Sequence, residues 1–185
     1  MSRPAVLFVC LGNICRSPLA EAALVKAAER AGLDVEVDSA GTGSWHVGDP
    51  PDPRAQETAR AMGSDIGHLR ARQISPDDFH RFTHILALDH ANLRSIQSMQ
   101  PAGSQAAISL LLDFVPGREG CEVADPYYGH TDGFAVTWAD VVAGAEGIVQ
   151  TLCASESRGS RSARRNCLRT NWCRLKHCLE ATSHR

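Results

Sequence analysis

Residues 6–18 read VLFVCLGNICRSP, in which an apolar run ends at a cysteine and an arginine follows six positions later. The run Ala5–Val9 is typical of a strand that is buried on both faces. Ser17 is a preferred N-cap residue and Pro18 suits a first helical turn, so a helix is expected to continue through Leu19–Arg30. This stretch therefore predicts a buried strand, a short loop and a helix.

Further along the chain, apolar runs alternate with amphipathic stretches. Strands are expected at Val35–Ser39, His84–Asp89 and Ala107–Leu112. Helices are expected at Arg54–Met62, from Ser75, at Ala91–Met99 and at Phe134–Cys153. Strands separated by helices predict a three-layer α/β fold, in which a four-stranded parallel sheet carries helices on both faces. Ligands of such sheets bind beyond the carboxyl ends of the strands, where Cys10 lies, and Asp89 is expected to be a cap at another strand end.

The charge of the chain is unevenly distributed. The 185 residues carry a net charge of −2. Residues 155–185 hold eight basic and two acidic residues, a charge of +6, so the rest of the chain carries −8. This contrast predicts one domain over residues 1–153 and a basic, disordered C-terminal tail over residues 154–185 that could bind an anionic partner. A shifted reading frame would also account for such a tail.

The composition also bears on location. No apolar run comes near the roughly 18 residues that a membrane span needs, and no charged start with an apolar stretch suggests export. Seven cysteines in no regular pattern do not resemble a disulfide framework. We therefore expect a cytoplasmic protein without a membrane partner, in a reducing compartment where Cys10 has a chemical role.

The loop after Cys10 has the composition of an anion cradle. Where a loop curls around the start of a helix, its backbone N–H groups point inward and attract negative charge. We expect five residues, called the cradle below, to bind an anion in this way: Leu11, Gly12, Asn13, Ile14 and Cys15. Gly12 would relax a tight turn, and Asn13 tolerates a left-handed conformation. Arg16 adds a planar guanidinium that can hold two phosphate oxygens at once.

The same field acts on the thiol of Cys10. A helix N-terminus and a nearby cation favour the thiolate, which is the nucleophilic form of cysteine. The hydroxyl of Ser17 can donate to this sulfur, both in the nucleophile and in the leaving group. The spacing Cys-x5-Arg-Ser-Pro between a strand and a helix therefore predicts phosphate chemistry, while the sequence contains no G-x4-G-K-[ST] motif.

These residues resemble the active-site signature of the low-molecular-weight protein tyrosine phosphatases. The resemblance covers about Ala5 to Cys153, through VLFVCLGNICRSPLAEA, VDSAGT, GDPPDPR, RARQI, DDF, LALDHANL and DPYYG. It implies a compact α/β fold and hydrolysis of phosphotyrosine in proteins, or of small aryl phosphates, through a phosphocysteine. The implied reaction uses no metal, no cofactor and no nucleic acid.

This chemistry needs a general acid, because the phenolate that leaves has a pKa of about 10. In the motif DPYYG, Asp125 matches the acid position of the family. It would protonate the phenolate and then, as a base, activate the water that hydrolyses the phosphocysteine. Tyr127 and Tyr128 are expected to form one wall of the cleft.

Three further residues follow from the resemblance. Trp45, in a Gly-rich loop, is either a partly buried anchor or a wall that sandwiches the substrate ring, as the matching aromatic residue does in the family. Ser39 matches a position whose hydroxyl braces Asn13. Cys15 either contributes only its backbone or acts as a resolving thiol that forms a reversible disulfide with Cys10.

Three rival functions depend on the same positions. Protein-arginine phosphatases resemble this loop but carry threonine in place of Ile14, so Ile14 and Tyr127 favour aryl phosphates. A thiol-dependent arsenate reductase on this fold would need further cysteines, and residues 80–90 hold none. A phosphate-binding module would be expected to lack Cys10 or Asp125. We therefore predict a protein tyrosine phosphatase with Cys10, Arg16 and Asp125 as catalytic residues.

Overall fold

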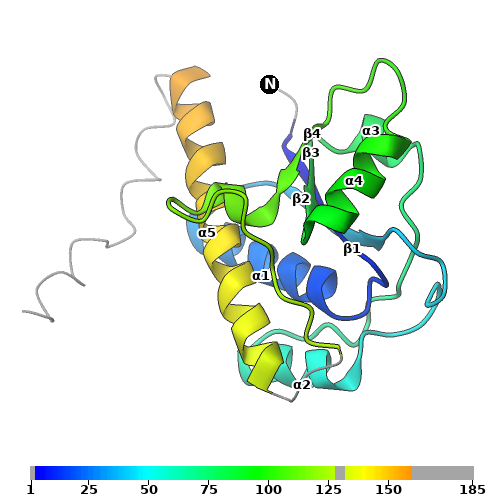
Figure 1. Ribbon diagram of the computed structural model, residues 1–185. Coiled ribbons are helices and arrows are strands. Elements are labelled where there is room, and N and C mark those ends of the chain that lie inside the picture. Colours follow the sequence, from blue (N-terminus) through cyan, green and yellow to red (C-terminus); the bar gives the residue numbers. More distant parts are fainter. Residues whose placement is uncertain (1–2, 128–131, 160–185) are drawn as a thin grey trace, which may run out of the picture.

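The computed structural model describes residues 3–127 and 132–159. In these ranges four parallel strands form one sheet in the order β2-β1-β3-β4 (Figure 1). The strands are Ala5–Cys10 (β1), Glu36–Gly41 (β2), His84–Ala87 (β3) and Ala107–Leu110 (β4). Strand β1 pairs with β2, where Cys10 lies opposite Gly41, and with β3 on its other side. The predicted parallel sheet is confirmed, and Cys10 lies at the carboxyl edge of a central strand.

Helices cover both faces of this sheet, as predicted. The helices are α1 (Arg16–Ala31), α2 (Pro53–Ala61), α3 (Asp78–Arg81), α4 (His90–Met99) and α5 (Asp132–Gly159), with a 3-10 helix η1 (Leu111–Phe114). Helices α1 and α5 pack against each other on one face, and α2 contacts both of them (Figure 1). Helices α3 and α4 contribute to the core on the opposite face. The arrangement is the predicted three-layer α/β fold.

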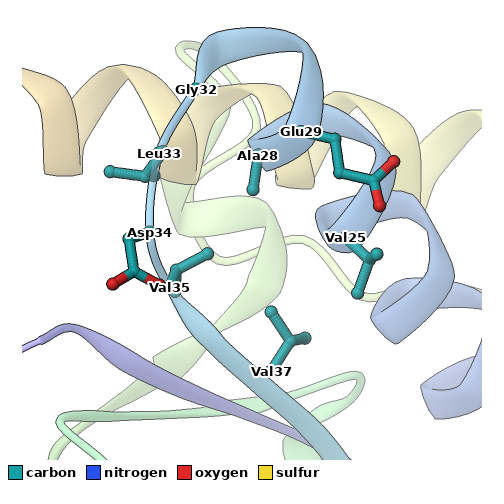
Figure 2. Close-up of a pocket in the computed structure, with 8 residues that line it drawn as sticks. All are labelled: Val25, Ala28, Glu29, Gly32, Leu33, Asp34, Val35 and Val37. Atoms are coloured by element: carbon teal, nitrogen blue, oxygen red, sulfur yellow. The ribbon is translucent and has the colours of Figure 1, made fainter.

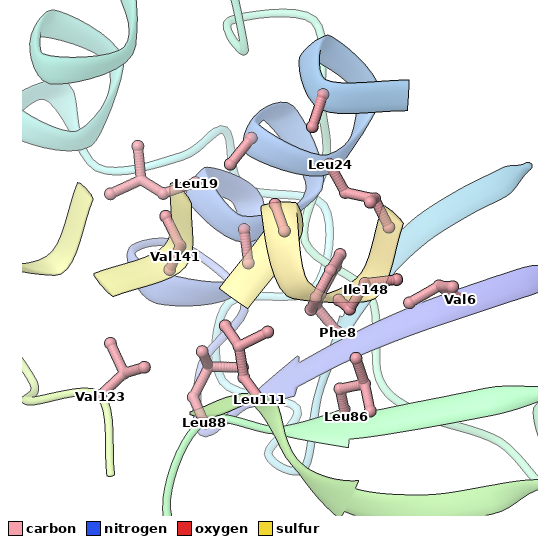
Figure 3. Packing of buried hydrophobic residues seen from close by; sticks show 14 of the residues in the cluster. Val6, Phe8, Leu19, Leu24, Leu86, Leu88, Leu111, Val123, Val141 and Ile148 are labelled. Atoms are coloured by element: carbon pink, nitrogen blue, oxygen red, sulfur yellow. The ribbon is translucent and has the colours of Figure 1, made fainter. Parts of the chain in front are cut away.

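The side chains of β1 divide between two cores. Val6 and Phe8 pack with Leu19 of α1 and with residues of α5 (Figure 3). Leu7 and Val9 belong to the second core, on the side of α3 and α4. Because successive side chains of a strand point to opposite faces, a strand that is buried on both sides has to be apolar throughout. The central position of β1 in the sheet thus explains why the residues before Cys10 are all apolar.

Several elements differ from the sequence prediction at their ends, among them β3, which was predicted to reach Asp89 and ends at Ala87. Helix α1 begins at Arg16 with Cys15 in the N-cap position, so the prediction that Ser17 caps this helix is wrong. The Ser17 hydroxyl instead lies 3.1 Å from the sulfur of Cys10, within hydrogen-bond distance of it. Strand β4 ends at Leu110, earlier than predicted, because the chain turns directly into η1.

The last helix runs beyond its predicted end. Helix α5 continues past Cys153 to Gly159, so the segment predicted as a tail begins inside this helix. The rest of that segment, residues 160–185, lies outside the described residues. In the two described ranges no helix combines the length and the apolar character that crossing a bilayer requires.

Candidate active site

Cys10 lies where β1 enters the cradle. Only 3% of the residue is exposed. Its Sγ atom accepts a hydrogen bond from the backbone N–H of Asn13 at 3.3 Å and lies 3.1 Å from the hydroxyl oxygen of Ser17. Asn13 lies in the loop before α1 and Ser17 lies in the first turn of this helix. Backbone N–H groups without helical partners at a helix start attract negative charge. The surroundings of this sulfur therefore suit an anion.

Asn13 fixes the shape of the cradle. Its φ is 56°, which confirms the left-handed conformation expected there. Its Nδ2 atom donates to the hydroxyl oxygens of Ser17 and Ser39, at 2.9 Å each. Its Oδ1 atom accepts from the backbone N–H of Arg72, also at 2.9 Å. The structure thus places Ser39 beside Asn13 and ties the cradle to two other segments of the chain.

Two glycines allow neighbouring segments to approach the cradle. A Cβ atom at Gly41 would lie 2.8 Å from the carbonyl oxygen of Leu11, which is closer than real structures tolerate. A Cβ atom at Gly12 would lie 3.1 Å from a ring carbon of His46. The φ of Gly12 is not positive, so a left-handed backbone is not what requires glycine at this position. Its small size instead leaves room for the imidazole.

Arg16 is buried among three acceptors. Only 4% of its side chain is exposed. Its Nη1 atom donates to the carboxylate of Asp89 at 2.7 Å and to the carbonyl oxygen of Val123 at 3.2 Å. Its Nη2 atom donates to the carboxylate of Asp125 at 2.7 Å. The side chain of Asp89 is 18% exposed and that of Asp125 is 42% exposed, so one partner is enclosed and the other lies at the surface.

Asp89 has a second contact that the sequence did not reveal. It caps α4, where it accepts from the backbone N–H of Asn92 at 2.7 Å, and it also binds Arg16. Burial alone would raise the pKa of Asp89, but hydrogen bonds from Asn92 and Arg16 hold that pKa below the ordinary carboxyl value. Because β1 and β3 are neighbours, the residues that follow them lie side by side. Only the order of the strands, therefore, could have pointed to this contact.

A cleft of about 280 Å³ opens over the cradle. Ten residues from three parts of the chain line it: Cys10, Leu11, Gly12, Ile14, Cys15, Arg16, Trp45, His46, Asp125 and Tyr127. Trp45 is 71% exposed and Tyr127 is 39% exposed. The interpretation of Trp45 as a partly buried anchor is therefore wrong, and its ring is available to a ligand. Tyr128 lies outside the described residues.

Cys15 lines the cleft but is buried, with 5% of the residue exposed. Burial, followed by the nearby charges of Asp52 and Cys10, raises the pKa of Cys15 to about 12. The thiol is therefore protonated at neutral pH, and a protonated thiol is a poor nucleophile. This environment favours the interpretation in which Cys15 contributes its backbone rather than its sulfur.

Glu21 extends the hydrogen bonds behind the cradle. The hydroxyl of Ser39 donates to Glu21 Oε2 at 2.6 Å and accepts from Asn13. Burial, partly offset by the bond from Ser39, raises the pKa of Glu21 to about 7. Nothing in the sequence pointed to this contact, because the one other carboxylate of the same helix, Glu29, is exposed.

Two other possibilities for a site can be set aside. A second hollow lies between the end of α1 and the start of β2, next to Gly32 and Val35 (Figure 2). It is at the amino-terminal edge of the sheet, opposite Cys10, and its lining of apolar side chains with Glu29 and Asp34 contains no nucleophile. Among the residues that the structure describes, no group of three or more His, Cys, Asp or Glu side chains could hold a metal ion.

Comparisons with known proteins agree with this arrangement. A family model described as low molecular weight phosphotyrosine protein phosphatase matches residues 5–158. The protein of that name from Schizosaccharomyces pombe is 43% identical over 150 residues, which are 80% of this chain and 96% of that protein. The crystal structure of YfkJ from Bacillus subtilis has a TM-score of 0.78 at 39% identity, covering 84% of this chain and 98% of that one. The structure of the drosophila arginine phosphatase DARP has a TM-score of 0.75 at 34% identity, covering 80% of this chain and 96% of that one.

Proposed function

Because this chain belongs to the low molecular weight phosphotyrosine protein phosphatase family, we propose that it hydrolyses phosphotyrosine and other aryl phosphate monoesters with Cys10 as nucleophile. One observation carries the proposal. The thiol of Cys10, the guanidinium of Arg16 and the carboxylate of Asp125 line a single cleft, although Asp125 is 109 residues from Arg16. A thiol, an anion-binding group and an acid are the three parts that hydrolysis through a covalent intermediate requires.

Binding begins with an exchange of partners at Arg16. The phosphate of the substrate enters the cradle and accepts hydrogen bonds from its backbone N–H groups. Two phosphate oxygens replace the carboxylate of Asp125 on the guanidinium, which can hold both at once. Asp89 stays in place, because it is the less exposed of the two carboxylates and is also held by Asn92. The released side chain of Asp125 is then free to approach the leaving group.

Two chemical steps follow. The thiolate of Cys10 attacks phosphorus, an S–P bond forms and the P–O ester bond breaks. Asp125, which takes up a proton from solvent after it leaves Arg16, gives that proton to the departing phenolate. In the second step the Asp125 carboxylate takes a proton from a water molecule, which attacks phosphorus and breaks the S–P bond. The thiolate that leaves is stabilised by the Asn13 N–H and by the hydroxyl of Ser17. Inorganic phosphate is the product, and Cys10 and Asp125 return to their initial states.

The rim of the cleft supports an aromatic substrate. Trp45 and Tyr127 both line the cleft and are exposed, so they are available to stack on a phenyl ring. The similarity to an arginine phosphatase makes phosphoarginine the main rival substrate. Ile14 lines the cleft where that class carries threonine, and its apolar side chain suits an aryl group better than a guanidinium. We expect peptides with phosphotyrosine to be hydrolysed faster than matched peptides with phosphoarginine.

An arsenate reductase is less compatible with the site. The free cysteines in the described residues are Cys10, Cys15, Cys121 and Cys153, and Cys15 is the one that lines the cleft with Cys10. Because the pKa of Cys15 is raised to about 12, its thiol is poorly suited to pass electrons onward at neutral pH. The acid at Asp125, by contrast, serves a hydrolytic reaction.

Location and further partners extend this proposal. A nucleophilic Cys10 has to stay reduced, and the cytoplasm is the compartment that maintains thiols in that state.

The seven basic residues and one acidic residue of 160–185 would attract an anionic partner. Among the described residues the cleft is lined by residues between Cys10 and Tyr127, and we expect catalysis not to depend on residues 160–185.

The decisive experiment measures hydrolysis of p-nitrophenyl phosphate in the presence of EDTA. We expect turnover by the wild type and none by Cys10→Ser, which should still bind inorganic phosphate because the cradle and Arg16 are unchanged. Cys121→Ser is the matched control, since Cys121 is exposed and lies outside the cleft, and it should keep full activity. Undiminished activity in Cys10→Ser would refute the assignment of the nucleophile.

A further inference from the structure

Arg54 bridges helix α2 to the segment Asp125–Tyr127, called the acid loop below. Its Nη1 and Nη2 atoms both donate to the carbonyl oxygen of Tyr127, at 3.3 Å. Its Cζ atom lies 5.8 Å from the centre of the Tyr127 ring and 4.9 Å from the centre of the Phe134 ring in α5. A guanidinium over an aromatic face is attracted by the ring electrons. The Arg54 side chain therefore holds both the backbone and the ring of the residue two positions after Asp125.

The other end of this bridge is fixed by Asp52. The carboxylate of Asp52 accepts from the backbone N–H, the Nε atom and the Nη2 atom of Arg54, at 2.8, 3.0 and 2.8 Å. The bonds from Arg54 hold the pKa of Asp52 below its ordinary value, so this carboxylate is ionised at neutral pH. The backbone N–H of Asp52 donates to the carbonyl oxygen of Ile14 at 2.8 Å. Continuous contacts therefore join the cradle to the acid loop through Asp52 and Arg54.

The acid loop is held at both ends. Before Asp125, the carbonyl oxygen of Ala124 accepts from the hydroxyl of Thr137 at 3.3 Å. After it, the carbonyl oxygen of Tyr127 accepts from Arg54. A general acid has to come within hydrogen-bond distance of the atom that it protonates. The two anchored positions limit where the Asp125 carboxyl can go once phosphate has displaced it from Arg16.

We propose that Arg54 is a positioning residue of this reaction, which holds the acid loop at Tyr127 so that the carboxyl of Asp125 reaches the leaving oxygen. The inference rests on the proposed function. Arg54 does not line the cleft, so it acts through Asp125 and not by touching the substrate. Its loss should weaken acid catalysis and leave phosphate binding by the cradle and Arg16 intact.

The test compares kcat/KM for two substrates that differ in leaving group. Phenyl phosphate releases a phenol with a pKa of about 10 and needs the acid, whereas p-nitrophenyl phosphate releases a more acidic phenol and needs it less. We expect Arg54→Gln to lower kcat/KM about tenfold for phenyl phosphate and less than about threefold for p-nitrophenyl phosphate. Arg54→Lys, which keeps the charge but loses the fork, should lie in between. The inhibition constant of inorganic phosphate should stay within about twofold of the wild-type value.

A double variant separates positioning from a general structural role. In the background Asp125→Ala, Arg54→Gln should cause no further loss for phenyl phosphate, because the group that it positions is gone. Arg60→Gln is the matched control, since Arg60 is an exposed arginine of the same helix that bonds to Gln56. It should resemble the wild type with both substrates.

Three results would overturn the inference. They are an equal loss with both substrates, a persistent tenfold loss in the Asp125→Ala background, and a wild-type profile in Arg54→Gln. If Arg54→Gln does not fold, Arg54→Lys is used instead, and the loss of kcat/KM for phenyl phosphate is again compared with the loss for p-nitrophenyl phosphate. An inactive wild type, or an active Cys10→Ser, would reject the proposed function itself. Activity that depends on Cys10 but not on Arg54 would reject the inference alone.

Discussion

Arg16 and Asp125 are joined by a hydrogen bond of 2.7 Å between guanidinium and carboxylate. In the proposed reaction Arg16 binds the phosphate, and in this structure Asp125, the proposed acid, occupies one of its donors. The enclosed carboxylate of Asp89 occupies another. In the proposed reaction Arg16 keeps Asp89 and the carbonyl oxygen of Val123 as partners and exchanges only Asp125 for phosphate. This exchange would couple phosphate binding to the release of the acid.

The first prediction concerns Asp125, the partner that Arg16 exchanges. Asp125→Ala should lower kcat/KM for phenyl phosphate by about 10²–10⁴-fold, with a smaller loss for p-nitrophenyl phosphate, because only the poor leaving group depends on the proton. The same variant should bind inorganic phosphate at least as tightly as the wild type, since Arg16 loses a competing anion. Asp125→Asn is the matched comparison, because it can still accept from Arg16 but cannot donate a carboxyl proton. Equal losses for both substrates would argue against an acid at this position.

The second prediction concerns Asp89, a partner that Arg16 keeps. Asp89→Asn keeps a good N-cap for α4 but removes the charge that faces buried Arg16. An uncompensated buried cation is costly, so the free energy of unfolding should fall by roughly 2 kcal/mol, measured by urea titration. Asp34→Asn is the control, because it breaks an exposed ion pair with Arg3. It should change the free energy of unfolding by less than about 0.5 kcal/mol. If the two variants were equally stable, Asp89 would not be supporting Arg16.

Saturating inorganic phosphate provides a further check on Asp89. The added anion supplies the charge that Asp89→Asn lacks, and a ligand that binds only the folded state stabilises it. Phosphate should therefore raise the melting temperature of Asp89→Asn by more than it raises that of the wild type. An equal rise in both proteins would mean that Asp89 and the phosphate do not share Arg16.

The succession of strands and helices along the chain could be predicted because it depends on local patterns, whereas the order of the strands within the sheet does not. The run Ala5–Val9 has to be apolar throughout in a strand that packs on both faces, and such runs mark the strands. The ends of elements are less local. Ser17 has the chemistry of an N-cap, but the sulfur of Cys10 and the amide of Asn13 lie within reach in the folded chain and bind its hydroxyl instead.

The catalytic site could be predicted only in part for the same reason. Cys10 and Arg16 lie on one loop, so their proximity follows from spacing, whereas Asp125 could be assigned to them only through a family resemblance. The contacts of Asp89 and Arg54 were not predicted, because each depends on which segments become neighbours after folding. A polar residue shows its chemistry in the sequence, but its partner is decided by the tertiary structure.

The third prediction concerns oxidation of the nucleophile. A protective disulfide forms when the thiolate of Cys15 attacks oxidised Cys10, and the pKa of Cys15 is raised to about 12. The thiolate fraction is small at neutral pH and grows about tenfold with each pH unit. After peroxide exposure, recovery by dithiothreitol should be similar for the wild type and Cys15→Ser at pH about 6.5, and better for the wild type at pH about 8.5. A large advantage of the wild type at the lower pH would show that Cys15 is a resolving thiol despite its burial.

The fourth prediction uses the carboxyl of Glu21 behind the cradle. Burial raises the pKa of Glu21 to about 7 from an ordinary value of 4.5, so the folded state binds this proton more tightly than the unfolded state. The resulting stability is fully present below pH 4.5 and is lost as the pH rises through about 7. Glu21→Gln cannot ionise and can still accept from Ser39, so it should escape this loss. Its advantage over the wild type in the free energy of unfolding should grow between about pH 5 and pH 8 by up to roughly 3 kcal/mol. Glu29→Gln is the control, because Glu29 is exposed on the same helix, and it should show no such trend. A constant difference in the free energy of unfolding between Glu21→Gln and the wild type at both pH values would mean that Glu21 is ionised in the folded protein throughout.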